Sequence, residues 1–424
     1  MTLSAGSHRR PYTRAYLGTF VLLLWLPLAA TAATYGGGAG TADNPFLIQT
    51  AEQFALIGDN PADWGLHFRL VNDIDLSGYD ETSLRLIGRW VGLGSTANQP
   101  FSGSFDGNGR TIRGFRYRDL NSDYVGLFRH VKGDISDLHV AGATVVANGS
   151  GTGALIGYLE EGRVTGCSAT RVDVSGNAST GALAGLVDGS LYMCWSNGKV
   201  AGVRYVGGLA GRTGGGTISR SCSKAAVFGS ESVGGLLGGA STQMSAVDSC
   251  YAAGPVDGDS YVGGLVGQLV AGKVFRCYSV GAVSGRQSAG GLVGYQRALA
   301  EVLGSLWDTE ASKQATSVGG AGKTTAEMKS IDTYFDQNWD FATTWTICEG
   351  ISYPILLWQI PVGDLRCPDG VDFTDFRWFA ANWRHRDCGV LNYSCDGADL
   401  DGDGEVGHRD LALFSANWLA GIDW

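Results

Sequence analysis

Val206-Gly-Gly-Leu-Ala-Gly211 is one copy of a glycine-leucine signature that occurs seven times between Tyr124 and Gly294. The leucines of the seven copies follow one another at intervals of 26 to 29 residues: Leu127, Leu155, Leu183, Leu209, Leu236, Leu265 and Leu292. A repeat of nearly fixed length in this range is typical of a solenoid, in which copies of one supersecondary unit stack on each other. The signature therefore predicts a repeat fold for the middle of the chain.

A second landmark runs in phase with the first. Five cysteines follow one another at intervals of 27 or 28 residues: Cys167, Cys194, Cys222, Cys250 and Cys277. Apolar residues precede most of them by three positions (Val164, Leu191, Val247, Val274) or follow them by six (Val200, Phe228, Val256, Val283). If a cysteine and the residue three before it both point inward, they cannot belong to one regular strand, so a corner or a bulge separates them. One repeat then contains three short strands joined by glycine corners.

These features predict an all-β domain, a right-handed parallel β-helix of about seven coils. Each strand of such a solenoid pairs with its equivalent in the next coil at about 4.8 Å, so equivalent side chains stack into ladders inside a narrow core. We expect the five cysteines to form one inward ladder of free thiols, because stacked equivalents point the same way rather than toward each other.

The N-terminus is typical of an export signal. Arg9, Arg10 and Arg14 precede an apolar run and a small-residue box at 30–32, which predicts a signal peptide over residues 1–32. A transmembrane anchor is the alternative, but the apolar run is short for a span. The mature chain is therefore expected to be secreted or on the cell surface, with no membrane span. Its formal net charge of −10 argues against a nucleic-acid partner.

The sequence predicts further segments around the repeats. Residues 33–120 do not repeat and are expected to cap the open N-terminal end of the solenoid, with a strand, an Asp106-Gly-Asn-Gly turn and a second strand near their end. The coils occupy 121–305, an aromatic-rich C-terminal cap and linker follows at 306–362, and a small helical calcium-loop module takes 363–424.

The repeated signature resembles a known motif. With Cys250-Tyr251 and Cys277-Tyr278-Ser279 as partner sequences, the Val-Gly-Gly-Leu-x-Gly copies resemble the GLUG-motif repeats of bacterial secreted proteins over most of residues 120–345. The resemblance implies a secreted β-helix and leaves activity open, since such repeats occur in adhesins and beside unrelated domains. A cell-surface adhesin is therefore one alternative function.

Residues 399–410 (DLDGDGEVGHRD) form the strongest chemical motif of the chain. Carboxylates at loop positions 1, 3, 5 and 12, with a glycine at position 6, are what a hard, oxygen-seeking cation requires. We predict that Ca²⁺ is bound by four side chains and by the backbone carbonyl of Glu405. The four side chains are those of Asp399, Asp401, Asp403 and Asp410.

The helix that follows this loop is duplicated. Asp375–Trp383 (DFRWFAANW) precedes Asp410–Trp418 (DLALFSANW) by 35 residues. The loop-helix pair is similar to a type I dockerin, which implies a calcium-folded module that docks onto a cohesin-like or other protein partner.

The first loop departs from that pattern. Aligning Gly370 with Gly404 leaves one residue too few before Asp375, and Cys367 occupies a ligand position. One strong and one weak calcium site are therefore expected. A disulfide among Cys367, Cys388 and Cys395 would staple this small core, with the pairing left open.

No catalytic constellation is visible in the sequence. Gly-x-Ser-x-Gly, His-Glu-x-x-His and Cys-x-x-Cys are all absent. Arg220 and Asp248 are expected on adjacent coils as a surface ion pair, and Tyr192 and Trp195 fit either a sugar-stacking face or a packed aromatic ladder. We therefore predict a non-catalytic binding or scaffold protein without catalytic residues. The alternative is a polysaccharide lyase or glycoside hydrolase of a polysaccharide-degrading assembly, and polysaccharide is a second candidate partner.

Overall fold

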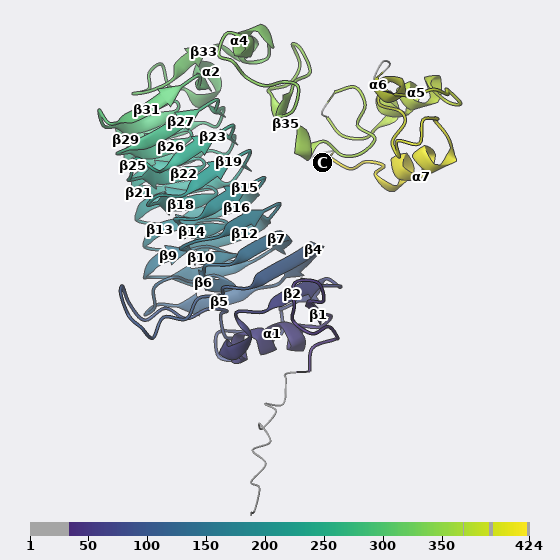
Figure 1. The fold of residues 1–424 in the computed structure, drawn as a ribbon. Coiled ribbons are helices and arrows are strands. Elements are labelled where there is room, and N and C mark those ends of the chain that lie inside the picture. Colours follow the sequence, from purple (N-terminus) through teal and green to yellow (C-terminus); the bar gives the residue numbers. More distant parts are fainter. Residues whose placement is uncertain (1–33, 368, 390–392, 422–424) are drawn as a thin grey trace, which may run out of the picture. The chain divides into compact units, whose positions relative to one another are not determined.

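A computed structural model describes residues 34–367, 369–389 and 393–421 (Figure 1). The predicted signal peptide lies outside the described residues. One sheet of the solenoid contains seven parallel strands, one from each coil. In chain order they are β6 (Phe128–Val131), β10 (Ile156–Leu159), β14 (Ala184–Val187), β18 (Ala210–Thr213), β22 (Leu237–Ala240), β26 (Val266–Leu269) and β30 (Val293–Gln296). The parallel β-helix of about seven coils is thus confirmed.

The rest of each coil belongs to a second, larger sheet, whose strands also pair in parallel from coil to coil. One row of it comprises β7 (Asp134–Ala141), β11 (Arg163–Thr165), β15 (Ser190–Tyr192), β19 (Thr217–Ser219), β23 (Ala246–Asp248), β27 (Gly272–Phe275) and β31 (Ala300–Leu303). The strands that follow along each coil are β8 (Thr144–Ala147), β9 (Ser150–Thr152), β12 (Ser168–Ser175), β13 (Ala178–Gly181), β16 (Trp195–Ala201), β17 (Arg204–Gly207), β20 (Cys222–Ser223), β21 (Ala226–Gly234), β24 (Tyr251–Ala252), β25 (Val256–Gly263), β28 (Tyr278–Ser279), β29 (Val283–Gly290) and β32 (Leu306–Asp308).

The signature leucines stack in the core, as expected for equivalent side chains of successive coils. All seven are at most 1% exposed, and the backbone amide of Leu209 donates to the carbonyl of Leu236 at 2.9 Å, as that of Leu236 does to Leu265. The glycines beside them allow backbone to approach backbone. A Cβ on Gly211 would lie 2.1 Å from the carbonyl carbon of Ser179, so no side chain fits there. Glycine is therefore required by the closeness of neighbouring turns.

The cysteine ladder differs from the prediction at one rung. The five cysteines are buried free thiols, as predicted, but Ser221 rather than Cys222 stacks on Cys194. Ser221 Oγ donates to the carbonyl of Ser219 at 2.8 Å, as Cys194 Sγ does to Tyr192 at 3.4 Å. Cys222 instead pairs with Trp195 and Tyr251 on the neighbouring strands and packs in an aromatic cluster.

The same one-residue slip affects the apolar residues that follow. Val227, not Phe228, aligns with Val200 and Val256 in the core, and Phe228 is 40% exposed. The error arose because Cys222 lies midway between Cys194 and Cys250, whereas the rung itself lies one residue earlier. Cys194, Cys222 and Cys250 are evenly spaced, although the two coils between Cys194 and Cys250 differ in length.

The segment before the first coil pairs with that coil through its last two strands. It contains β1 (Phe46–Ile48), α1 (Ala51–Asp59), η1 (Pro61–Asp63), β2 (His67–Leu70), β3 (Ile74–Asp75), β4 (Ser104–Arg113) and β5 (Arg116–Asp119). The predicted turn at Asp106 is wrong, because β4 runs through it as one strand with a register shift between Asp106 and Arg110. Asn108 and Gly109 take positive φ there, so the extra residues form a bulge instead of a hairpin.

The segment after the last coil packs along the solenoid. It contains α2 (Thr309–Ser312), β33 (Ala321–Lys323), α3 (Thr325–Met328), α4 (Asp332–Phe335), β34 (Trp345–Thr346), β35 (Ile355–Leu356) and η2 (Leu357–Gln359). We call residues 325–359 the flank segment. Trp345 packs on Tyr251 and Tyr278, and Trp358 Nε1 donates to the carbonyl of Arg220 at 2.9 Å. The flank segment thus covers the outward row of Cys222, Tyr251, Tyr278 and Leu306, each at most 3% exposed.

The C-terminal module is built on two helices. These are α5 (Phe373–Ala381) and α7 (His408–Ala416), and a short turn labelled α6 (Tyr393–Asp396) lies between them in the sequence. Phe379 stacks on Phe414 with ring centroids 5.2 Å apart. Disulfides join Cys388 to Cys395 and Cys348 to Cys367. The duplication seen in the sequence therefore forms one small core.

Candidate metal centre

The four aspartates predicted to bind Ca²⁺ come together in the structure. One carboxylate oxygen from each of Asp399, Asp401, Asp403 and Asp410 lies within 4.8 Å of those of the other three. Asp399 and Asp410 are buried, whereas Asp401 and Asp403 are exposed at the rim of the loop. Ionised carboxylates that lie this close repel each other unless a cation or several donors neutralise them. The loop therefore has the chemistry of a hard-cation site.

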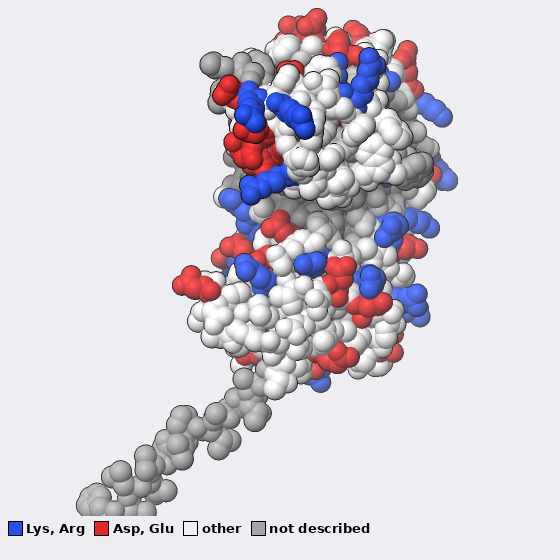
Figure 2. All heavy atoms as spheres, turned by 90° about the vertical axis from the view of Figure 1, so that its right-hand side faces the viewer, with Lys and Arg blue, Asp and Glu red and all other residues white. Residues whose placement is uncertain are grey.

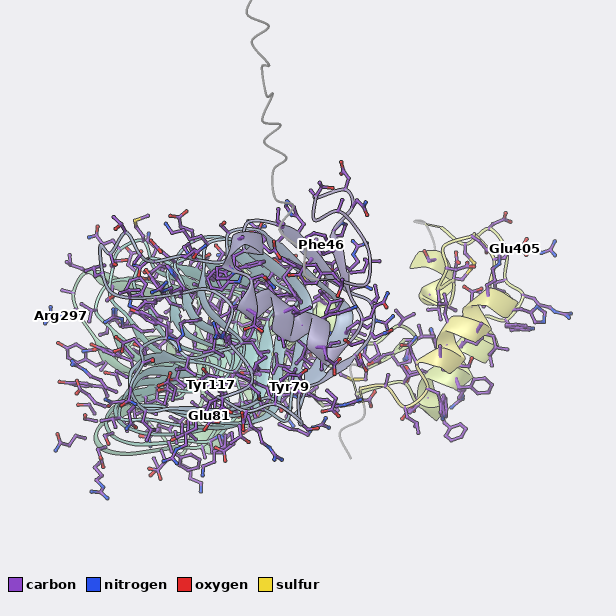
Figure 3. The ribbon with its side chains drawn as sticks, turned by 90° about the horizontal axis from the view of Figure 1, so that it is seen from below. Phe46, Tyr79, Glu81, Tyr117, Arg297 and Glu405 are labelled. Carbon is purple, nitrogen blue, oxygen red and sulfur yellow. A yellow bond between two sulfur atoms is a disulfide. The ribbon has the colours of Figure 1, made fainter. Side chains whose placement is uncertain are left out.

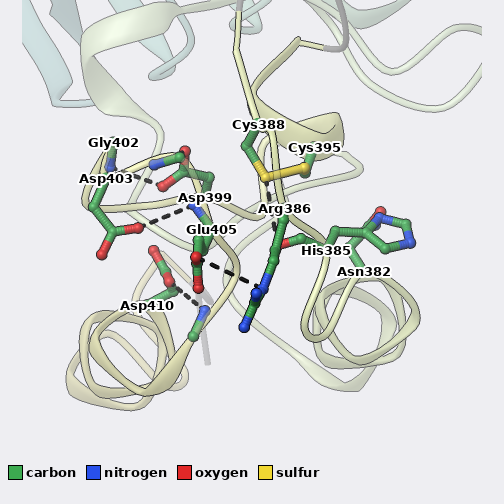
Figure 4. Close-up of a disulfide and its surroundings, with 12 residues drawn as sticks. Asn382, His385, Arg386, Cys388, Cys395, Asp399, Gly402, Asp403, Glu405 and Asp410 are labelled. Carbon is green, nitrogen blue, oxygen red and sulfur yellow. Dashed lines mark hydrogen bonds and ion pairs between the residues drawn. A yellow bond between two sulfur atoms is a disulfide. The ribbon is translucent and has the colours of Figure 1, made fainter.

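Backbone amides hold the two buried carboxylates in place (Figure 4). Gly402 and Gly404 donate to the two oxygens of Asp399 at 2.9 and 3.1 Å. The Oδ1 atom of Asp410 accepts from Leu400 and Asp401 at 2.7 and 3.0 Å. The loop backbone is thus wrapped around its own carboxylates and holds them close to one another.

The side chain of Glu405 faces Arg386, with Oε1 at 3.7 Å from Nε of that residue (Figure 4). Glu405 was predicted to bind Ca²⁺ through its backbone carbonyl. That contribution itself stays a prediction.

The first loop has the same register as the second. Asp364 and Asp375 stand 35 residues before Asp399 and Asp410. Leu365 and Arg366 donate to Oδ1 of Asp375 at 2.7 and 3.1 Å, which reproduces the bonds made to Asp410. Gly370 donates to Oδ2 of Asp364 at 3.1 Å. Gly404 makes the same bond to Oδ2 of Asp399, and both glycines have positive φ, so the predicted alignment of Gly370 with Gly404 holds at this point of the loop. The carboxylates at the two ends of the loops correspond at an offset of 35 residues, so the first loop carries its glycine one position later.

The first loop nevertheless has a different ligand set. Arg366 occupies the place of Asp401, and its guanidinium lies 4.0 Å from the centre of the Trp378 ring instead of facing the loop. The position of Asp403 is taken by Pro368, which lies outside the described residues. A third carboxylate comes from Asp369, and one oxygen each of Asp364, Asp369 and Asp375 lie within 4.8 Å of one another. Asp364 and Asp369 were not predicted, although the 35-residue offset would have indicated Asp364.

The carboxyl of Asp364 is affected by burial and by the neighbouring carboxylates of this cluster. Burial raises the pKa of its carboxyl to about 7, and the neighbouring carboxylates of Asp375 and Asp369 add to the effect. Its Oδ1 atom is buried and has no hydrogen-bond partner among the described residues. A bound divalent cation would provide the positive partner that this oxygen lacks. The residues of both loops therefore fit Ca²⁺, with four side-chain carboxylates in the second loop and three in the first.

The charged pair predicted on the solenoid is different in the structure. Asp248 aligns with Ser219, and its carboxylate accepts from Nη2 of Arg276 at 2.7 Å rather than from Arg220. The slip at Cys222 explains the error, because Arg220 was counted from that cysteine. Acidic and basic side chains are intermixed over the face drawn in Figure 2, as expected for paired surface charges. Asp248 and Arg276 thus form an ordinary partly exposed ion pair.

The module also presents apolar side chains on its surface. A pocket of about 380 Å³ lies between α5 and α7 and is lined by Phe373, Phe376, Leu411, Phe414, Ser415 and Trp418. Phe373 is 78% exposed and Phe376 is 42% exposed. Glu405, in the second loop, belongs to the same small module (Figure 3). The two acidic loops and an exposed apolar surface therefore belong to one compact unit.

Comparison with known proteins agrees with the fold and leaves the family open. No protein-family model matches the sequence. A protein named as a Gly-rich membrane protein, from Evansella cellulosilytica, is 32% identical over 156 residues, which cover 34% of this chain and 17% of the relative. Halomucin from Haloquadratum walsbyi is 31% identical over 360 residues, which cover 80% of this chain and 4% of the relative. The chain thus spans only a small part of either relative.

A solved structure shares the architecture. The crystal structure of a protein named as an immunoglobulin A1 protease, from Bacteroides ovatus, superposes with a TM-score of 0.52 and 21% identity, over 76% of this chain and 95% of the other. At that identity the likeness concerns the fold alone. Within the described residues, no helix combines the length and the apolar character that a membrane span requires.

Proposed function

We propose that this is an exported, non-catalytic β-helix protein that attaches to a protein partner through a Ca²⁺-dependent, dockerin-like module at residues 363–424. The observation that carries the proposal is the pair of acidic loops, in which equivalent carboxylates are held by equivalent backbone amides. In this proposal the GLUG-type coils are a rigid support, and the division into signal peptide, N-terminal cap, coils, C-terminal cap and module follows the predicted boundaries.

Two features support export. The Cys348–Cys367 and Cys388–Cys395 disulfides are compatible with an oxidising compartment and would be rare in a reducing cytosol. Millimolar extracellular Ca²⁺ can also saturate weak sites that a cytosolic protein could not fill. A secreted or cell-surface location therefore suits the chemistry of the module.

The exposed apolar pocket supports a protein partner. Aromatic side chains in a shallow pocket are the usual anchors of a protein interface. Phe373 caps one side of the pocket and contacts Trp418 edge to face, with ring centroids 4.9 Å apart. Because α5 and α7 each follow an acidic loop, Ca²⁺ binding would fix the two walls of this pocket relative to each other.

The test is a pull-down with the full-length protein in Ca²⁺ and in EDTA, from the exported proteins of the host, and in parallel against purified type I cohesin domains. We expect capture only in Ca²⁺, with loss in Asp401→Ala and in Phe373→Ala. Matched controls are Arg366→Ala, at the equivalent loop position, and Phe335→Ala, an aromatic on the flank segment that is 54% exposed. The same partners captured in EDTA, or by Asp401→Ala, would contradict the proposal.

A further inference from the structure

A cleft lies on the solenoid where the flank segment ends. The outward row of Leu306, Tyr278, Tyr251 and Cys222, covered by the flank segment, continues on the earlier coils as Trp195, Ser168, His139 and Thr111. Trp358, near the end of the flank segment, is bonded to the carbonyl of Arg220. Beyond this point Trp195, His139 and Thr111 are partly exposed, whereas Ser168 is buried.

The cleft has a volume of about 540 Å³ and combines aromatic with polar walls. Met193, Trp195 and Trp358 line one end, and Asp106, Asp137 and His139 line the other. Gly109 and Gly166 also line the cleft, and both have positive φ. A Cβ on Gly166 would lie 2.3 Å from Oδ1 of Asp137, so the absence of a side chain there allows the carboxylate to lie against Gly166.

The polar groups of the cleft are available to a ligand. Asp106 is paired with Arg69 at 2.7 Å, but Asp137 is exposed and has no hydrogen-bond or ion-pair partner among the described residues. His139 uses Nδ1 on Ser168 Oγ at 2.9 Å, which leaves Nε2 without a protein partner in the described part of the chain. Burial lowers the pKa of His139 below its ordinary value, so the imidazole is neutral at neutral pH.

These groups match the chemistry of a sugar. Indole faces pack on the C–H faces of a pyranose, and a carboxylate and a neutral imidazole bind its hydroxyls as acceptor and donor. Coils stack at about 4.8 Å, close to the length of one sugar ring, so the residues of successive coils can address successive rings. A polyanionic glycan is disfavoured, because Asp137 has no positive counterpart in the cleft.

We propose that this cleft binds an uncharged oligosaccharide, with Trp195 as the stacking platform and with Asp137 and His139 as the hydroxyl-binding groups. The site is separate from the calcium loops and does not depend on what the module binds. Asp106 and Arg69 neutralise each other and border the ligand without carrying specificity.

The test is calorimetric titration of the full-length protein in Ca²⁺ with cellohexaose, xylohexaose, mannohexaose and laminarihexaose. Hexagalacturonic acid and glucosamine hexamer serve as anionic and cationic comparisons. We expect at least one uncharged hexamer to bind, and Trp195→Ala and Asp137→Asn each to weaken it about tenfold or more. Phe228→Ala, which removes a 40% exposed aromatic on another strand, should leave the affinity unchanged.

Asp137→Asn keeps the test decisive if Trp195→Ala does not fold, because Asp137 is exposed and supports no other residue. The proposal is overturned if no uncharged hexamer binds, if Asp137→Asn binds as tightly as the unmodified protein, or if a charged hexamer binds more tightly than all of the uncharged ones. None of these outcomes depends on partner capture by the module.

Discussion

The β-helix and the C-terminal module hold their structures by opposite means. In the coils, buried leucines and valines stack in ladders, and backbones approach so closely that only glycine fits. In the module, a core of few apolar residues surrounds carboxylates that are themselves buried, including Asp375 and Asp410 at 1% exposure. A buried carboxylate is costly unless its charge is compensated.

This difference has a consequence for what each region needs from solution. Each coil is stabilised by its neighbours, so the solenoid depends on no ligand. The module has too small a core to be stable on burial alone and combines disulfides with acidic loops. Calcium should therefore matter greatly to one region and hardly at all to the other.

The largest effect is expected from a substitution in the coils. Gly211→Ala places a Cβ 2.1 Å from a backbone carbon of Ser179, and backbone in a ladder cannot move aside alone. We expect a loss of at least about 3 kcal/mol in the free energy of unfolding, measured by urea denaturation. Gly215→Ala in the same coil meets nothing closer than 3.8 Å and should change it by less than about 0.5 kcal/mol. Equal effects of the two variants would refute the close-approach explanation.

A second prediction compares the two loops at one equivalent position. Asp401→Ala removes a ligand from the second loop and should weaken the tightest Ca²⁺ site about tenfold or more, by calorimetric titration. Arg366→Ala should leave that site unchanged, because Arg366 packs on Trp378. Two Ca²⁺ sites of equal affinity in the unmodified protein would show that Asp369 fully replaces the missing ligands of the first loop.

A third prediction concerns the rungs of the cysteine ladder. Serine occupies the rung at Ser221 and again at Ser305, each bonded to the carbonyl two residues before it. Cys194→Ser should therefore be nearly neutral, whereas Cys194→Ala should cost about 1 kcal/mol through the lost contact and the void. Urea denaturation of both variants measures this. If Cys194→Ser lowers the free energy of unfolding more than Cys194→Ala does, a hydroxyl is not tolerated at this position of the ladder.

The smallest effect expected is a pH dependence of the module without calcium. Because the pKa of Asp364 is about 7 in the folded state and near 3.8 ordinarily, the folded state holds a proton that the unfolded state has lost between these values. Stability in EDTA should therefore fall as the pH rises from about 4 to about 7. The residual protection of the backbone amides of α5 and α7 in EDTA, compared across this pH range, measures it, and Asp364→Asn should remove the trend. If the stability of the module in EDTA instead rises over this pH range, the prediction is contradicted.

The sequence predicted the fold because the coils are local repeats with two landmarks. The prediction of the cysteine ladder was wrong by one residue at Cys222. This cysteine is evenly spaced from its neighbours in the sequence, but Ser221 occupies the position in the ladder. The acidic cluster of the second loop was predictable because its aspartates lie close together in the sequence. In the first loop the glycine served as the anchor, so the 35-residue correspondence of Asp364 and Asp375 with Asp399 and Asp410 was missed.

The cleft could not be predicted from the chain. Its walls come from Asp106, Asp137, Trp195 and Trp358, which are far apart in the sequence. Asp137 became visible as a candidate only through its place over Gly166. The flank segment was expected to close the end of the solenoid, and its packing along the coils depends on aromatic contacts that have no repeat.

The central claim, that calcium folds the module but not the coils, is tested most directly by hydrogen exchange of the full-length protein in Ca²⁺ and in EDTA. We expect backbone amides of α5 and α7 to lose most of their protection in EDTA, while those of the seven-stranded sheet β6 to β30 exchange equally slowly in both. Unchanged protection of α5 and α7 after Ca²⁺ removal would contradict the claim.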